Sequence, residues 1–88
     1  FAIVIEGVKS DVAKKITEAV NIPTIGIGAG NETDGQVLVW SDMLGFFEDF
    51  KPKFVRHYLN GAKLVKEAVN SYRDDVQTQN FPSKEEEY

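Results

Sequence analysis

The first charged residue of this 88-residue chain, Glu6, stands at the end of an apolar run. The run, FAIVI, is rich in β-branched residues and too short for a helix, so we predict a buried strand. In folds of parallel strands and helices, ligands bind beyond the carboxyl ends of the strands. A carboxylate that is partly withdrawn from water there becomes a stronger base. Glu6 is therefore a candidate catalytic base, and the alternative is a strand-end glutamate that is solvated or paired with a lysine.

A glycine-rich stretch, GIGAG, places Gly26, Gly28 and Gly30 two residues apart at the end of a second apolar run. Such a stretch can let the backbone approach a ligand or cradle a phosphate. The dinucleotide-binding pattern GxGxxG opens a helix, whereas a turn and another apolar run follow here. We expect backbone lining of a ligand site at these glycines rather than nucleotide binding. Tight packing at a crowded strand end is the alternative.

The residue types that ligate metals are scattered along the chain. His57 is the only histidine, and a lysine and a glycine occupy the positions four residues away on either side. A helical metal pair would need ligands there, so we predict a surface or packing role for His57 within a helix. Asp42 and the Glu48–Asp49 pair could bind a cation, but a helix cap and a solvated pair are favoured. The sequence thus predicts no metal site of its own.

The first half of the chain must supply the strands that position these residues. Ser10 is predicted to cap a helix that begins at Asp11, whose charge suits the positive end of the helix dipole. Asn21 and Pro23 end this helix. Its apolar stripe consists of Val12, Ile16, Ala19 and Val20. The stretch IPTIGIGAG is predicted to be the second buried strand.

The chain beyond the glycines is predicted to give a turn at Asp34–Gly35 and a third strand at residues 36–40. The stretch SDMLGFFEDF is consistent with a short helix capped by Ser41 or Asp42 and broken by Gly45.

A long helix is predicted after Pro52, because apolar residues recur there every three or four positions. Within it, Gly61 would cost roughly 1 kcal/mol relative to alanine. The stripe consists of Val55, Tyr58, Leu59, Ala62, Val65, Val69, Tyr72 and Val76. The polar residues that follow are predicted to be irregular.

Buried strands that alternate with amphipathic helices indicate a parallel sheet covered by helices. Three strands would leave two bare sheet edges, which favours aggregation unless more chain covers them. A buried strand that starts at Phe1 is also unusual for a natural amino terminus. We therefore expect a piece of a larger protein.

Composition excludes several classes of partner. Fourteen acidic residues against ten basic ones give a net charge of -4, which argues against a general nucleic-acid surface. The absence of cysteine excludes a disulfide scaffold and fits a reducing cytoplasm. No apolar run approaches the roughly 20 residues needed to span a bilayer. We expect neither nucleic acid nor membrane as a partner.

Several separated blocks occur in an order that resembles one enzyme family. These blocks are EGV, AKKITEAV, IPTIGIGAG, DGQVLV, SDMLG, PKFVRHY and FPSKEEEY. They resemble the C-terminal part of the 3-methyl-2-oxobutanoate (ketopantoate) hydroxymethyltransferases. The resemblance implies an α/β fold, the C-terminal part of a (β/α)8 TIM barrel of the phosphoenolpyruvate/pyruvate superfamily. Residues 1–76 would then form the last strands and helices, and residues 77–88 a polar tail.

The resemblance also implies a reaction. Members of the family transfer a hydroxymethyl group from 5,10-methylenetetrahydrofolate to 3-methyl-2-oxobutanoate, giving 2-dehydropantoate for pantothenate and coenzyme A synthesis. They bind Mg²⁺ and form homo-oligomers, commonly decamers, in the cytoplasm. The family's proton acceptor falls on Glu6, which would act on the C–H proton or on the new hydroxyl. Its metal ligands fall outside these 88 residues.

A barrel needs about 250 residues, so we expect the 88 residues to be inactive alone. Two alternatives stay open. One is another lyase or mutase of the same superfamily, which would not need folate. The other is a non-catalytic helical interaction module built on the long helix, for which Glu6 would be dispensable.

Overall fold

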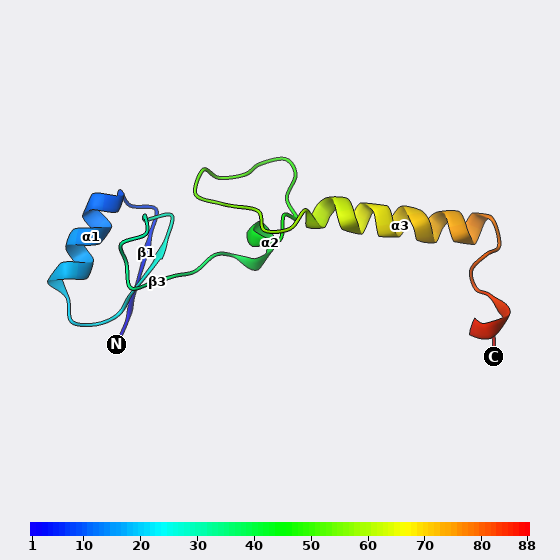
Figure 1. The fold of residues 1–88 in the computed structure, drawn as a ribbon, viewed down its shortest axis with the longest axis horizontal. Helices are drawn as coiled ribbons and strands as arrows, with labels where there is room; N and C mark the ends of the chain where they lie inside the picture. The colour runs from blue at the N-terminus through cyan, green and yellow to red at the C-terminus, as the bar shows by residue number, and fades with distance from the viewer.

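The computed structural model describes all 88 residues, and Figure 1 shows the strands at one end of an elongated molecule and the longest helix towards the other. The principal extents are 65 × 28 × 13 Å, and the radius of gyration is 21.2 Å. A compact domain of this length would have a radius of about 12 Å. The elements are β1 (Ile3–Glu6), α1 (Ser10–Ala19), β2 (Thr24–Ile27), β3 (Gly35–Gln36), α2 (Trp40–Met43), α3 (Gly61–Gln77) and the 3₁₀ turn η1 (Lys84–Glu86).

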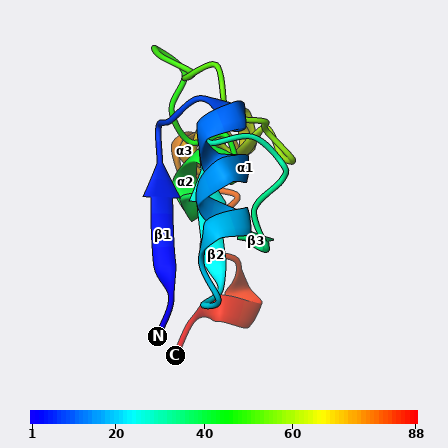
Figure 2. The same cartoon turned by 90° about the vertical axis from the view of Figure 1, so that its left-hand side faces the viewer.

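The three strands form one parallel sheet in the order β1-β2-β3. Glu6 of β1 lies opposite Ile27 of β2, and Ile25 of β2 lies opposite Gly35 of β3. Figure 2 shows β1 and β2 running side by side, with α1 in front of β2. The predicted parallel α/β arrangement is therefore confirmed for these strands, whereas the closed barrel remains a prediction.

A small apolar core forms where α1 packs on the sheet. Its centre is Ile5, Ala13 and Ala29, with Ile3, Val8 and Ile16 packed around them. On the other face of β1, Val4 is 62% exposed. The prediction of a buried strand is thus wrong for Val4 within these residues, because no element of this chain covers that second face.

The start of α1 differs from the prediction. Lys9, with an extended backbone, is the N-cap; Ser10 is the first helical residue, and no side chain caps the helix. Ser10 instead packs so close to Gly30 that a Cβ on the glycine would lie 2.5 Å from the serine Cβ. Ala13, not Val12, is the fully buried residue, and Val12 is 41% exposed. Packing against the loop after β2 therefore sets the position of this helix.

A polar network joins the amino end of β2 to its neighbours. The backbone N–H of the fully buried Thr24 donates to Oδ2 of Asp34 at 2.9 Å, and the Asp34 N–H donates to the Thr24 hydroxyl at 3.2 Å. The Thr24 hydroxyl also lies 2.9 Å from that of Thr17 in α1. Asp34, predicted only as a turn residue, thus links the loop before β3 to β2.

β3 is shorter than the predicted strand over residues 36–40. It spans only Gly35–Gln36, and one further N–H, that of Val37, donates to the Gly26 carbonyl at 3.0 Å. The neighbouring strand ends immediately afterwards, where Gly28 adopts φ +61°. The residues after Val37 then have no strand beside them, so the ladder cannot continue.

The short helix α2 includes both residues predicted to cap it. Val39 is its N-cap, so Ser41 and Asp42 lie inside the helix. Gly45 ends it as predicted, with φ +71°. The Gly45 N–H donates to the Asp42 carbonyl and the Phe46 N–H to the Ser41 carbonyl, which together form a Schellman motif.

The long helix α3 begins at Gly61, so the prediction of a helix from Pro52 onward is wrong for residues 53–60. Residues 46–58 form a loop whose ends meet in backbone hydrogen bonds. In these bonds the N–H of Tyr58 donates to the Met43 carbonyl (2.7 Å), that of Gly61 to the Leu44 carbonyl (2.7 Å) and that of Ala62 to the Gly45 carbonyl (3.0 Å).

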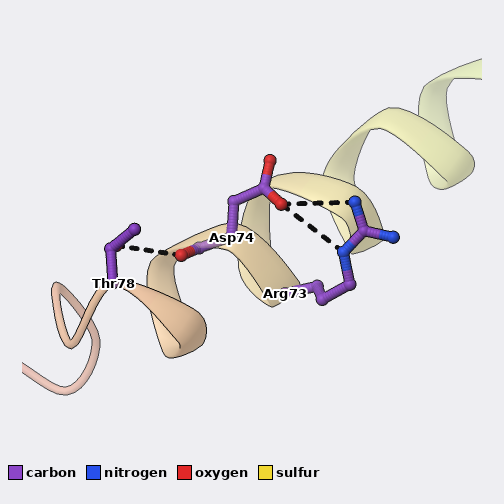
Figure 3. A network of polar contacts seen from close by, with 3 residues as sticks. All are labelled: Arg73, Asp74 and Thr78. Atoms are coloured by element: carbon purple, nitrogen blue, oxygen red, sulfur yellow. Dashed lines mark hydrogen bonds and ion pairs between the residues drawn. The ribbon is translucent and has the colours of Figure 1, made fainter.

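The carboxyl end of α3 is closed by polar contacts shown in Figure 3. The Thr78 hydroxyl and N–H both donate to the Asp74 carbonyl, at 2.9 and 3.0 Å. The Arg73 guanidinium lies 3.2 Å from the Asp74 carboxylate. The tail is not wholly irregular, because η1 is closed by a capping box of Ser83 and Glu86.

One long face of α3 is apolar and has no partner among these residues. Its members are Leu64, Val65, Val69, Tyr72 and Val76, each between 44% and 58% exposed. Only Tyr72 has an aromatic neighbour, Phe81 of the tail, edge-on at 5.5 Å. None of the helices combines the length and apolar character that crossing a bilayer requires.

Candidate active-site edge of the sheet

Glu6 lies at the carboxyl edge of the sheet, as predicted from the sequence. It is the last residue of β1. Gly7 follows in a left-handed conformation (φ +65°) and donates its N–H to the Ile27 carbonyl at 3.0 Å, which turns the chain towards α1. The Glu6 side chain is exposed and takes part in none of the ion pairs. Its carboxylate is therefore accessible at the edge where ligands bind in such folds.

The three glycines of GIGAG each pack against a different neighbour. A Cβ at the buried Gly26 would lie 2.7 Å from the Thr33 hydroxyl. A Cβ at Gly28 would lie 3.1 Å from the Phe54 ring, and one at Gly30 would meet α1. Close backbone packing is thus present at all three positions, and backbone contact with a ligand stays a prediction.

An open groove of about 1210 Å³ runs along the same edge. It brings the ends of β2 and β3 together with α1, α2 and the 46–58 loop. We call it the edge groove. It is lined by Ser10, Gly28, Ala29, Gly30, Asn31, Gln36, Val37, Leu38, Met43, Lys53, Phe54, Arg56 and Tyr58. Two of the three predicted glycines line it, whereas Gly26 and Glu6 do not.

The charges in the edge groove are all positive. Lys53 and Arg56 line it, and no aspartate or glutamate does, although the chain carries more acidic than basic residues. The Arg56 guanidinium lies 5.9 Å from the centre of the Tyr58 ring, and its Nη1 donates to the Tyr58 hydroxyl at 3.3 Å. The groove is therefore suited to an anionic ligand that also has an aromatic or apolar part.

The sequence prediction missed Lys53 and Arg56 as groove residues because it placed both in a helix. The segment KPKFVRHY, residues 51–58, contains basic, apolar and aromatic residues close together. Had a loop been predicted there, this mixture of cations and aromatic rings would have indicated candidate ligand-binding residues. Only the closure of the 46–58 loop against α2 brings them to the edge groove.

The metal-ligating residue types do not converge. His57 lies in the 46–58 loop, which corrects its predicted place in a helix. Glu48 is not simply solvated, because its carboxylate lies 3.4 Å from Lys66 of α3. No group of three His, Cys, Asp or Glu side chains could hold a metal ion.

Comparison with known proteins assigns the family. The family model described as ketopantoate hydroxymethyltransferase matches residues 1–84. The chain belongs to this family. Curated relatives named 3-methyl-2-oxobutanoate hydroxymethyltransferase occur in Aliarcobacter butzleri (84% identical), Nitratiruptor sp. (72%) and Campylobacter curvus (59%). Each match covers all of this chain.

The same matches cover 33%, 34% and 33% of the three relatives. The chain therefore spans about a third of the length of the curated relatives it matches. The predicted family is confirmed, and the names of these relatives describe hydroxymethyl transferases. Membership of an enzyme family favours the enzyme prediction over a non-catalytic helical module.

Proposed function

We propose that this chain contributes the strand end with Glu6 to the active site of a folate-dependent hydroxymethyltransferase. The reaction moves a one-carbon unit from 5,10-methylenetetrahydrofolate to 3-methyl-2-oxobutanoate and gives 2-dehydropantoate, for pantothenate and coenzyme A synthesis. The observation that carries the proposal is the place of Glu6. In a chain that belongs to the ketopantoate hydroxymethyltransferase family, it is an accessible carboxylate at the carboxyl end of a parallel strand.

The chemistry requires a base near the reacting carbon. The keto acid loses the proton from the carbon beside its carbonyl, and that carbon forms a bond to the one-carbon unit of the folate. Water supplies the oxygen of the new hydroxyl, and tetrahydrofolate leaves. A carboxylate accepts such protons when it lies within hydrogen-bonding reach. Glu6 would serve either the C–H proton or the hydroxyl proton.

The Mg²⁺ of the proposed enzyme is assigned to residues outside this chain. Ca²⁺ and Mg²⁺ are bound by oxygen ligands that converge on one point, and no such cluster is present here.

The proposed working form is a complete (β/α)8 barrel of which residues 1–76 are the C-terminal strands and helices and residues 77–88 a polar tail. The second face of β1 and the apolar face of α3 are both exposed. This supports the proposal that further chain covers them. We propose that the whole enzyme is a homo-oligomer, a decamer as the resemblance implies, and that it works in the cytoplasm without nucleic-acid or membrane partners.

The test is an assay of the full-length polypeptide that contains these residues. We expect it to form 2-dehydropantoate from 3-methyl-2-oxobutanoate only when 5,10-methylenetetrahydrofolate is supplied. Conversion of the keto acid without folate would favour another lyase or mutase of the superfamily and contradict the proposal. The 88 residues alone should form no product, and measurable turnover by them would contradict their proposed dependence on the rest of a barrel.

A further inference from the structure

We propose that Lys53 and Arg56 bind the carboxylate tail of the folate co-substrate in the edge groove. This inference rests on the proposed function and extends it from the reacting carbon to the far end of the co-substrate. Tetrahydrofolate consists of a pterin, an aminobenzoyl ring and a glutamate, so its far end carries both an aromatic ring and carboxylates.

The charge of the groove selects an anion. Lys53 and Arg56 are its only charged lining residues, and neither is engaged in an ion pair. The acidic residue of the same loop that forms an ion pair, Glu48, contacts Lys66 and does not line the edge groove. Two cations that line one groove without a carboxylate partner are suited to bind a ligand carboxylate, and arginine can do so in bidentate fashion.

The lining of the groove suits the larger co-substrate, and the groove has room for it. Sites for ligands of drug size occupy about 300–1,000 Å³, and the edge groove is an open space of about 1210 Å³. Phe54, whose ring lies over Gly28, and Tyr58 line it beside the two cations, so an aminobenzoyl ring and a glutamate would both find suitable neighbours.

The position of the groove separates tail binding from chemistry. Glu6 lies at the same carboxyl edge of the sheet but does not line the groove. A long co-substrate could place its one-carbon unit near Glu6 while its tail extends along the groove. The keto acid must react beside the base, which does not line the groove.

Steady-state kinetics of the full-length enzyme would test this assignment. The variants are Lys53→Gln, Arg56→Gln and the double substitution, and the control is Lys51→Gln, which removes a charge from the same loop outside the edge groove. We expect the double variant to raise the KM for 5,10-methylenetetrahydrofolate at least about tenfold. Its kcat and its KM for 3-methyl-2-oxobutanoate should stay within about twofold of wild type, as should all parameters of the control.

A co-substrate analogue without glutamate separates the possible sources of the carboxylate. We expect the carboxamide of 5,10-methylenetetrahydropteroate, which carries neither the glutamate nor a free carboxylate, to be a poor substrate for the wild type, with a raised KM. The double variant should use both co-substrates with similar KM values. A variant whose KM rises for the keto acid instead would overturn the assignment, because the cations would then bind that carboxylate. Unchanged KM values in the double variant would also overturn it.

The activity of the wild-type enzyme separates failure of the groove assignment from failure of the proposed function. A wild-type enzyme that is active, with variants that keep a normal KM for folate, would overturn only the groove assignment. A wild-type enzyme without folate-dependent activity would overturn the proposed function as well. An unchanged kcat of the variants would show that they remain folded.

Discussion

At the residue scale, the glycines of this chain meet two different requirements. Gly7 and Gly30 both have positive φ, +65° and +79°, which alanine adopts only with strain. A Cβ on Gly7 would have no atom within 4 Å, whereas one on Gly30 would meet the first residue of α1. Gly7 is thus required only by its left-handed backbone conformation. Gly30 is required both by that conformation and by its close packing against α1.

Alanine substitutions at these two positions should separate the two effects. Gly7→Ala should lower the free energy of unfolding by about 1–2 kcal/mol, the cost of a left-handed residue. Gly30→Ala should lower it by about 3 kcal/mol or more, because α1 must also move. Chemical denaturation of both full-length variants would measure the difference, and an equal loss in both would contradict the packing seen at Gly30.

Local patterns predicted Glu6 at a strand end and Gly45 as a helix breaker, because each depends on its immediate neighbours in sequence. They did not predict that Ser10 packs on Gly30, or that Lys53 and Arg56 line the edge groove. Those contacts join segments distant in sequence, and no local preference of the residues records them. The part of the site that comes from one strand could therefore be predicted, and the part that comes from loop closure could not.

At the scale of elements, the start of α3 shows a helical pattern that tertiary bonds override. Apolar residues recur at helical spacing from Val55 onward, and Val55 itself is buried, but it lies in the 46–58 loop. The backbone bonds between residues 43–45 and 58–62 hold that loop. A Cβ on Gly61 would clash with the Leu44 carbonyl oxygen. Gly61 is thus required by a close backbone approach.

The substitution Gly61→Ala distinguishes the two interpretations by the sign of its effect. Within a helix interior it should stabilise the protein by about 1 kcal/mol. The structure predicts a loss of about 1–3 kcal/mol instead, because the Leu44 backbone must shift. Thermal and urea unfolding of the full-length variant would show which holds. As a control, Asn70→Ala at an exposed position of α3 should be neutral or slightly stabilising.

At the scale of the whole molecule, the chain has much surface and little interior. Only 8 of its 88 residues are buried, and its radius of gyration far exceeds that of a compact domain of equal length. The sequence predicted bare sheet edges from the number of strands. It could not predict the extended course of α3, because residues outside this chain would decide what its apolar face contacts.

This shape predicts the behaviour of the 88 residues as an isolated chain. So little buried apolar surface does not offset the entropy of ordering the backbone, so we expect no cooperative thermal transition. Circular dichroism and calorimetry should show a gradual loss of helix, whereas the full-length protein should unfold in a sharp transition. A sharp transition of the monomeric 88-residue chain, independent of its concentration, would contradict this expectation.

The proton transfer assigned to Glu6 is the central claim, and Glu6→Gln in the full-length protein tests it most directly. The amide keeps the size of the side chain but cannot accept the proton. We expect kcat for 2-dehydropantoate formation to fall by about 10²-fold or more, with an unchanged circular dichroism spectrum. Glu18→Gln, at an exposed position of α1, should keep wild-type turnover. If Glu6→Gln also keeps wild-type turnover, Glu6 is not the base and the account of this edge is wrong.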